Sequence, residues 1–355
     1  MSQVHNFSAG PCILPQSVLQ EAAQACIEFN GMGLSLLEIS HRSKQFVAVM
    51  DEARQLVREL LNLSDRYEVL FLQGGATLGF LTAAQNFMPE GGKAAYIDTG
   101  TWASGAIKEA KLVGSVDVIA SSKASNYDRI PDFTVPNDSA YLHFTSNNTI
   151  FGTQFKTFPK HANLLCDMSS DIFSKSFNAE DFTLIYAGAQ KNMGPAGTVL
   201  YIVDKEKLGK TGRTLPTYLD LANHIDKESM LNTPPVFPVY VSMLTLRWLK
   251  SIGGVPAIEK INNAKAELMY KAIDELPLFE GHAQPGSRSH MNATFRLTDE
   301  SLAAEFNAMW KAAGVSGIEG HRSVGGYRAS MYNALPLESV KALTDVMYEL
   351  ARTKG

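Results

Sequence analysis

The sequence predicts an α/β protein with a large domain built on a mostly parallel sheet and a smaller α+β domain after it. Between residues 67 and 203, short apolar runs with strand character alternate with helical patterns. This alternation is typical of a parallel sheet whose two faces are covered by helices. The length of 355 residues corresponds to roughly two domains of about 150 residues each.

The strands expected in the large sheet are short and strongly apolar. They cover residues 67–72, 94–97, 116–120, 141–144, 163–166, 183–186 and 198–203. Helical patterns at 78–87 and at about 103–112 lie between them, and a long amphipathic stretch follows at 238–249. Ligands of open α/β sheets bind beyond the carboxyl ends of the strands, so residues directly after these strands are the candidates for a site.

The pattern changes at Gly253-Gly254, where we place the domain boundary. A long helix (255–276), a β-like segment (291–297), a helix (301–313), a glycine-rich segment (314–327) and a closing helix (337–353) follow it. The segment from Pro11 to Pro15 looks like a connector, so the first residues are expected to pack on the second domain. The predicted domains are therefore 16–254, and 1–15 together with 255–355.

Composition restricts the classes of partner. A net charge of −4 and a pI of about 6.1 give no reason to expect a nucleic acid or a membrane as partner. Three cysteines, Cys12, Cys26 and Cys166, form neither a disulfide framework nor a zinc-binding spacing. With no signal-peptide pattern and no bilayer-length apolar stretch, we expect a soluble cytoplasmic protein without a metal.

A glycine-rich turn, Gln73-Gly74-Gly75-Ala76-Thr77, follows the first strand and leads into a helix. Glycines let a backbone approach a ligand closely, and a helix N-terminus offers free N–H groups to a phosphate. A tight turn without a ligand explains the same residues equally well.

Two more polar segments follow predicted strands. Trp102, in the segment 98–102, could stack on a flat ring at the mouth of a site, or it could be a partly buried core residue. The polar segment 143–152 could line a site or form a capped loop.

Asp167 and Lys191 each follow a strand and are harder to explain as surface residues. A carboxylate at the end of an apolar strand is either a helix N-cap or the partner of a cationic ligand. Lys191 stands among small residues, where loss of hydration lowers the amine pKa and favours the neutral nucleophile. Together with the glycine-rich turn and Trp102, these residues are the parts that hold pyridoxal phosphate.

At this point the chain resembles the phosphoserine aminotransferase family, within the class V aminotransferases of fold type I. The resemblance runs essentially from end to end. Its most specific segments are NFSAGP (6–11), SHRS (40–43), YAGAQKNMGPAG (186–197), NTPP (232–235) and GHRSVGGYRAS (320–330). It implies a fold-type-I transferase that uses pyridoxal 5'-phosphate, acts as a homodimer with shared active sites, and has phosphoserine, glutamate and 2-oxoglutarate as substrates.

The resemblance also implies a role for each matching residue. Lys191 would bond covalently to the cofactor and Asp167 would pair with its ring nitrogen. Thr149 would bind the ring hydroxyl, Trp102 would stack on the ring, and Ala76, Thr77 and Gln190 would contact the phosphate, with Asn232 and Thr233 of the neighbouring subunit. The substrate's carboxylate and phosphate would be bound by His41, Arg42, His321, Arg322 and Arg328. Arg328 is expected to take the α-carboxylate and the other four the distal anion; exposed surface charges are the competing explanation for Arg42 and Arg322.

One departure concerns the glycine-rich turn. Relatives can carry an arginine there, where this chain has Ala76-Thr77, so one cationic contact to phosphate is expected to be missing. The resemblance implies serine biosynthesis, and leaves open a second role with 4-phosphohydroxythreonine in pyridoxine biosynthesis.

Other functions fit less well. A cysteine desulfurase needs a mobile cysteine late in the chain, and all three cysteines precede residue 170. The nicotinamide-binding Gly-x-Gly-x-x-Gly turn is absent, and Asp204 stands where a P-loop needs its first glycine. An alanine-glyoxylate type of class V aminotransferase and a non-catalytic cofactor-binding relative remain as alternatives.

Overall fold

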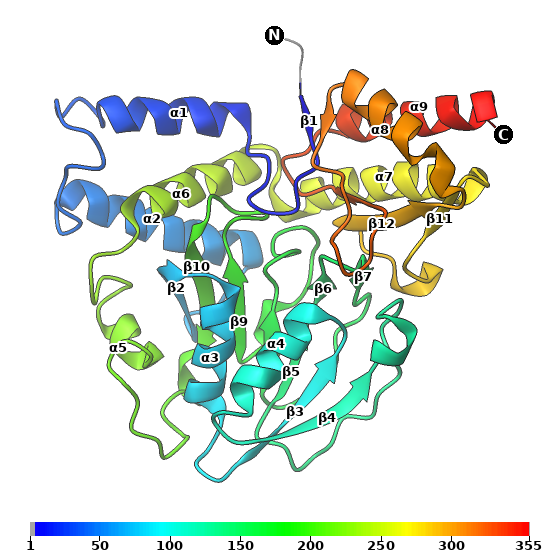
Figure 1. Cartoon of the computed structure of the whole chain (residues 1–355). Coiled ribbons are helices and arrows are strands. Elements are labelled where there is room, and N and C mark those ends of the chain that lie inside the picture. The colour runs from blue at the N-terminus through cyan, green and yellow to red at the C-terminus, as the bar shows by residue number, and fades with distance from the viewer. Residues whose placement is uncertain (1–3, 355) are drawn as a thin grey trace.

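The computed structural model describes residues 4–354 and contains a seven-stranded sheet next to a smaller three-stranded one (Figure 1). The large sheet has the order β2 (Tyr67–Gly74), β10 (Gly197–Asp204), β9 (Leu184–Gly188), β8 (Leu164–Asp167), β5 (Leu142–Thr145), β3 (Lys93–Asp98) and β4 (Ser115–Ser121). Strand β10 runs in the direction opposite to the other six strands, so both of its pairings, with β2 and with β9, are antiparallel. The mostly parallel sheet is thus confirmed, with each predicted strand placed to within two residues.

Both faces of the large sheet are buried except along its edge strand β4, and this burial explains why the other strands are largely apolar. In β9, for example, Ile185 packs into the core shared with α2 and α6, whereas Tyr186 packs into the core shared with α3 and α4. The helices of the first face are α1 (Gln16–Ile27), α2 (Lys44–Leu61) and α6 (Val236–Ser251). Those of the second face are α3 (Ala76–Phe87), α4 (Thr101–Ala110) and the short α5 (Leu221–Asp226).

Helices α1 and α2 lie in a part of the chain for which we had predicted no element. The signal for α2 was present: Ser43 caps the helix by accepting a hydrogen bond from the Phe46 N–H. Its buried residues also recur at three- and four-residue intervals, as on the inner face of an amphipathic helix.

The C-terminal part has its own core. The antiparallel strands β11 (Phe279–Gly281), β12 (Asn292–Leu297) and β14 (Tyr327–Ser330) pack with α7 (Gly254–Glu275), α8 (Ala303–Ala312) and α9 (Leu337–Lys354). Strand β14 begins at the last residue of the predicted glycine-rich segment (314–327) and continues where no element was expected. The strand β1 (His5–Asn6) pairs in parallel with β13 (Val315–Ser316), so these two residues pack on the C-terminal part.

The predicted boundary near Gly254 stays a prediction. Helix α7 begins at that residue, yet it contributes to both cores. Val255 and Ile258 pack with the large-sheet core, whereas Met269 and Ile273 pack with the C-terminal core. Within residues 4–354, none of the helices is long and apolar enough to cross a membrane.

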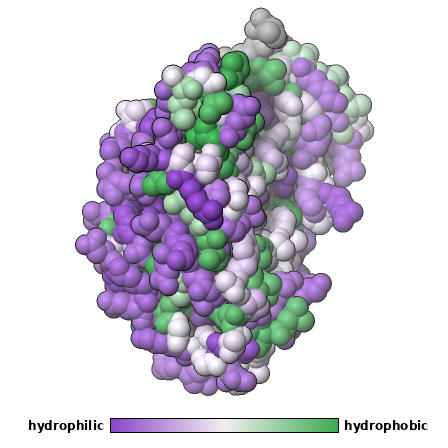
Figure 2. Space-filling model, turned by 90° about the vertical axis from the view of Figure 1, so that its left-hand side faces the viewer, coloured by the Kyte–Doolittle hydropathy of each residue, from purple (hydrophilic) through white to green (hydrophobic). Residues whose placement is uncertain are grey.

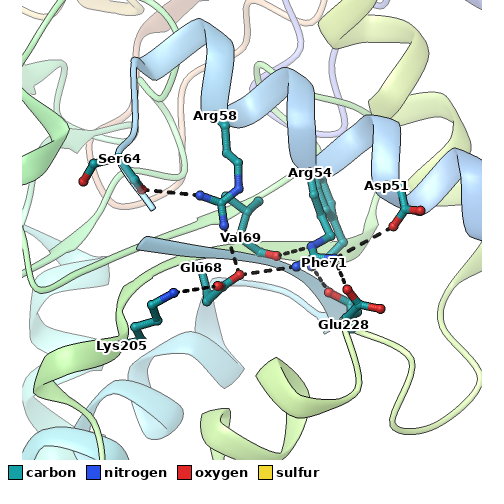
Figure 3. Close-up of polar contacts among 10 residues, drawn as sticks. Asp51, Arg54, Arg58, Ser64, Glu68, Val69, Phe71, Lys205 and Glu228 are labelled. Atoms are coloured by element: carbon teal, nitrogen blue, oxygen red, sulfur yellow. Dashed lines mark hydrogen bonds and ion pairs between the residues drawn. The ribbon is translucent and has the colours of Figure 1, made fainter. Parts of the chain in front are cut away.

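Strand β2 lies at one edge of the large sheet, and a cluster of ion pairs covers it (Figure 3). The Glu68 carboxylate lies 3.0 Å from the guanidinium of Arg58, 3.3 Å from that of Arg54 and 3.3 Å from the ammonium of Lys205. Arg54 also donates a hydrogen bond of 3.1 Å to the Val69 carbonyl. The cluster therefore ties α2 to β2 and to the residue after β10, and it puts charges on an edge that would otherwise be free to pair.

Candidate active site

A cavity of about 310 Å³ lies beyond the carboxyl ends of the strands of the large sheet. This is the position that the parallel sheet predicts for a ligand. Its lining residues are Ala9, Gly10, Gly75, Ala76, Thr77, Trp102, Asn147, Thr149, Ile150, Asp167, Ser169, Ser170, Gln190, Lys191, His321 and Arg328. Nine of the predicted site residues are therefore brought together in one chain.

Lys191 lies in the turn after β9 with its amine in the cavity wall. The side-chain nitrogen donates a hydrogen bond of 2.7 Å to the Thr149 hydroxyl and lies 5.8 Å from the centroid of the Trp102 ring. Burial lowers the pKa of this amine to about 8, although the charge of Asp167 acts in the opposite direction. A large share of the amine is thus neutral, and nucleophilic, only slightly above neutral pH.

Asp167 ends β8 and is 3% exposed. One carboxylate oxygen accepts hydrogen bonds from the Ser169 N–H at 3.0 Å and from the Ser169 hydroxyl at 2.6 Å. An N-cap makes the same backbone bond, but the residues that follow form turns and not a helix. Burial raises the pKa of Asp167, while the Ser169 hydrogen bonds and the charge of Lys191 oppose the rise. A cation bound beside it would further favour the carboxylate form.

The glycine-rich turn places a helix N-terminus at the cavity. Helix α3 begins at Ala76, and no side chain of the described part of the protein caps it. Gly74 has a φ of 122°, and a Cβ there would lie 2.9 Å from a Leu78 methyl group, so this position requires glycine. Gly75, Ala76 and Thr77 line the cavity with first-turn N–H groups suited to an anion.

Trp102, Thr149 and Gln190 also line the cavity. Trp102 lies in the first turn of α4 and is 37% exposed, which is more than expected for a core tryptophan. Its ring, the Lys191 amine and the Asp167 carboxylate therefore border the same space.

Arg328 supplies positive charge on the side of the cavity formed by the C-terminal part, and His321 adds an imidazole whose pKa is lowered by burial and by the charges of Arg328 and Arg322. Arg328, on β14, lies with its Nη1 3.5 Å from the Thr149 carbonyl, and its buried Nε has no hydrogen-bond partner within residues 4–354. Burial lowers the pKa of this guanidinium. A buried donor without a partner is costly, so the geometry favours an anionic ligand that would accept from it.

Five predicted residues do not line the cavity of their own chain: His41, Arg42, Asn232, Thr233 and Arg322. His41 has a buried Nε2 without a hydrogen-bond partner in the described residues, whereas Arg42 and Arg322 are exposed. The Thr233 carbonyl accepts a hydrogen bond of 3.0 Å from the Gln73 side chain.

Ser169, Gly10 and Cys12 also contribute to the site, although we had not predicted them. Ser169 had a local signal, because an Asp two residues before a Ser favours a side-chain turn of this kind. Gly10 and Cys12 had none. A Cβ on Gly10 would lie 3.5 Å from the Lys191 side chain, and the Cys12 thiol donates a 2.6 Å hydrogen bond to the Lys191 carbonyl across 179 positions. Burial raises the pKa of that thiol to about 12, so it is a hydrogen-bond donor and not a thiolate.

Comparison with known proteins decides the family. The sequence pattern of the class V aminotransferases matches residues 4–343. The chain belongs to the class V aminotransferase family. The fold-type-I architecture and the enzyme class implied by the resemblance are thus confirmed.

Close relatives within this family share one name. A phosphoserine aminotransferase of Flavobacterium psychrophilum is 64% identical over 349 residues, which covers 98% of each chain. The crystal structure of phosphoserine aminotransferase from Bacillus circulans subsp. alkalophilus is 43% identical, covers all of both chains and superposes with a TM-score of 0.96. A structure of the enzyme from Trichomonas vaginalis with bound pyridoxal phosphate is 34% identical, covers 98% of this chain and 100% of that one, and has a TM-score of 0.92.

Proposed function

We propose that this class V aminotransferase is a phosphoserine aminotransferase of serine biosynthesis. It transfers the amino group between O-phospho-L-serine and 2-oxoglutarate, with 3-phosphohydroxypyruvate and L-glutamate as products, in both directions. The observation that carries the proposal is that the Arg328 guanidinium and the His321 imidazole, two groups that can donate hydrogen bonds to an anion, line the same cavity as Lys191 and Asp167. Near-full-length relatives of 49–64% identity that bear this name support it.

Pyridoxal 5'-phosphate is the cofactor of this aminotransferase, and the cavity fits it: an amine, a buried carboxylate and an uncapped helix N-terminus border one space. When bound, it supplies an aldehyde that accepts the amino group and a ring that accepts electrons from the substrate's Cα. The residues proposed to hold it are Ala76, Thr77, Trp102, Thr149, Asp167, Gln190 and Lys191. The turn at Ala76-Thr77 would bind the phosphate through backbone N–H groups and one hydroxyl, without an arginine.

Lys191 and Asp167 are proposed as the catalytic residues. With a pKa near 8, the Lys191 amine could accept a proton from the substrate's Cα near neutral pH and deliver it to the cofactor carbon that is bonded to the transferred nitrogen. Asp167 supplies a negative charge in the wall of the same cavity, where it would stabilise a protonated ring nitrogen. The Ser169 hydrogen bonds hold that carboxylate in one orientation.

Substrate recognition is proposed to rest on arginines and histidines, because an arginine binds a carboxylate or phosphate through two parallel hydrogen bonds. Arg328, with its unpartnered Nε, would bind the α-carboxylate. His41, Arg42, His321 and Arg322 would bind the distal phosphate. Because His41, Arg42 and Arg322 do not line the cavity of their own chain, their role requires a second subunit to complete the site.

We therefore propose a homodimer in which Asn232 and Thr233 reach the cofactor phosphate of the neighbouring subunit. Apolar side chains exposed on and after α1 support an interface there: Ile27 is 76% exposed and Leu37 61%. Figure 2 shows apolar residues among hydrophilic ones on this side of the molecule. Light scattering tests the dimer. Mixed dimers of Lys191→Ala and Asn232→Ala chains should recover activity above either parent if the sites are shared.

A coupled assay tests the reaction. Purified protein is given phosphoserine and 2-oxoglutarate, with alanine and aspartate as alternative donors, and the expected result is a clear preference for phosphoserine. A preference for alanine would indicate that the protein is an alanine-glyoxylate type of aminotransferase. Cofactor binding without turnover of any donor would indicate a non-catalytic relative. Adding 4-phosphohydroxythreonine to the assay tests the second role, in pyridoxine biosynthesis. A cytoplasmic location is proposed with the function.

A further inference from the structure

A small hydrophobic cluster stands apart from the larger cores and joins distant parts of the chain. Tyr127, Ile150 and Phe151 are only 3–8% exposed, and half-buried Val324 packs against them. The rings of Tyr127 and Phe151 lie 4.8 Å apart. The first three residues follow β4 and β5 of the large sheet, whereas Val324 belongs to the turn before β14. We call the three residues Tyr127, Ile150 and Phe151 the Val324 seat.

The turn that carries Val324 also carries His321, which lines the cavity. The His321 carbonyl accepts hydrogen bonds from the N–H groups of Val324 at 2.9 Å and Gly325 at 2.8 Å. At the base of the turn, the Gly320 N–H donates to the Gly326 carbonyl at 2.9 Å. A Cβ on Gly320 would lie 2.0 Å from the Gly325 carbonyl oxygen, so the base is closed as tightly as glycine allows. The turn is therefore a closed unit, and fixing Val324 fixes His321.

The seat is itself tied to the cavity. Ile150 lines the cavity directly after Thr149, and its carbonyl accepts a 3.1 Å hydrogen bond from the Thr294 hydroxyl. The Tyr127 hydroxyl lies 3.2 Å from a carboxylate oxygen of Asp98 at the end of β3. Val324 thus contacts residues whose positions are set by the strands that also position the cavity wall.

We propose that Val324 is a positioning residue for substrate specificity: its contact with the seat holds His321 where it meets the phosphate end of the substrate. This inference rests on the proposed phosphoserine aminotransferase function. Glutamate has a carboxylate and not a phosphate at that end, so its binding depends less on the exact position of the turn. Loss of the Val324 contact should therefore weaken phosphoserine more than glutamate.

Val324→Thr tests the proposal, because it keeps the shape of the side chain and adds a hydroxyl that the apolar seat cannot satisfy. We expect the KM for phosphoserine to rise about threefold to tenfold, as for the loss of a partly buried apolar contact, with kcat changed less than about twofold. The KM for glutamate should stay near that of the wild type. Val324→Leu keeps an apolar side chain in contact with the seat, so its KM for phosphoserine should stay close to that of the wild type. Val118→Thr, on exposed β4 away from the cavity, is the matched control.

Trypsin cleavage after the exposed Arg322 gives a second measurement that needs no substrate. A released turn opens more often, so Val324→Thr should be cut faster at this bond than the wild type or Val118→Thr, with other cleavages unchanged. Unchanged cleavage and an unchanged phosphoserine KM would overturn the role of Val324, as would equal KM increases for both substrates. If the wild type fails to turn over phosphoserine, the proposed function is wrong, and so is the role of Val324 in specificity. Faster cleavage of Val324→Thr would in that case still show that Val324 holds the turn in place.

Discussion

The side-chain nitrogen of Lys191 donates a hydrogen bond to the Thr149 hydroxyl across a separation of 42 residues. The two residues meet because they follow β9 and β5, which both pair with β8. The parallel arrangement brings the carboxyl ends of these strands to one edge of the sheet. In this position the Lys191 amine is buried and faces a hydroxyl acceptor.

The first prediction concerns the pH at which Lys191 becomes reactive. Only the neutral amine attacks an aldehyde, and its pKa is lowered from 10.5 to about 8. At pH 7, roughly a tenth of the amine is then neutral, against less than about a thousandth for an ordinary lysine. The rate at which cofactor-free protein takes up pyridoxal phosphate covalently should therefore rise with pH and level off above pH 8. Stopped-flow visible absorbance measures it, and a midpoint near 10 would contradict the burial argument.

Thr149→Val gives a matched test of the same amine. The hydroxyl accepts a hydrogen bond from the amine and so favours its charged form. Without that acceptor the midpoint of the pH profile should move below that of the wild type. A midpoint above that of the wild type would show that the Thr149 hydroxyl does not stabilise the charged amine.

The second prediction separates the charge of Asp167 from its structural hydrogen bonds. Asp167→Asn keeps an oxygen that can accept from Ser169 but removes the negative charge. We expect kcat to fall on the order of 10²- to 10³-fold, as when a transition-state electrostatic contact is lost, with little change in thermal stability. Ser169→Ala keeps the charge but loses the hydroxyl's hydrogen bonds to Asp167 and from the Gly188 N–H, and it should reduce kcat much less. Equal losses in the two variants would show that orientation matters more than charge.

The sequence predicted those parts of the site that follow strands. Asp167 and Lys191 could be found because apolar strands precede them and because a buried charge requires a partner or a ligand. The antiparallel direction of β10 could not be predicted, since a strand buried on both faces has the same composition in either direction. Gly10 and Cys12 reach Lys191 only through the tertiary fold, so no local pattern could reveal them.

The residues expected to bind substrate show a different limit. His321 lies at the cavity, whereas Arg322, His41 and Arg42 do not, although the His41-Arg42 and His321-Arg322 pairs have similar surroundings of small residues in the sequence. A sequence records which side chains are available, but not whether a cavity is completed by one chain or two. The competing explanation of Arg42 as an exposed charge therefore stays open for the single chain.

The third prediction divides the anion-binding roles. Arg328→Ala should raise the KM roughly 10- to 100-fold for glutamate and phosphoserine alike, because both carry the α-carboxylate and a hydrogen bond to a charged group is lost. His321→Ala or Arg42→Ala should mainly raise the KM for phosphoserine. Steady-state kinetics with both donors measure the division, and equal losses in all three variants would show that it is wrong.

The fourth prediction concerns stability and the ion pairs of Figure 3. The Glu68 side chain is 16% exposed, and the arginines that contact it are 14% and 20% exposed, so solvent screens these pairs only in part. Glu68→Gln would leave the Arg54 and Arg58 guanidinium groups close together without their shared carboxylate. We expect the free energy of unfolding to fall by about 1 kcal/mol, between the values typical of surface and buried pairs.

Glu280→Gln is the matched control for Glu68→Gln. Glu280 pairs with Arg296 where both side chains are more than half exposed, so its loss should cost less than about 0.5 kcal/mol. Urea unfolding in low salt and again in 1 M NaCl compares the two variants. Salt screens exposed charges more than partly buried ones, so the deficit of Glu68→Gln should largely persist at high salt. If salt abolishes it, or if the two variants lose the same amount, the cluster on the edge strand stabilises the fold no more than an ordinary surface pair.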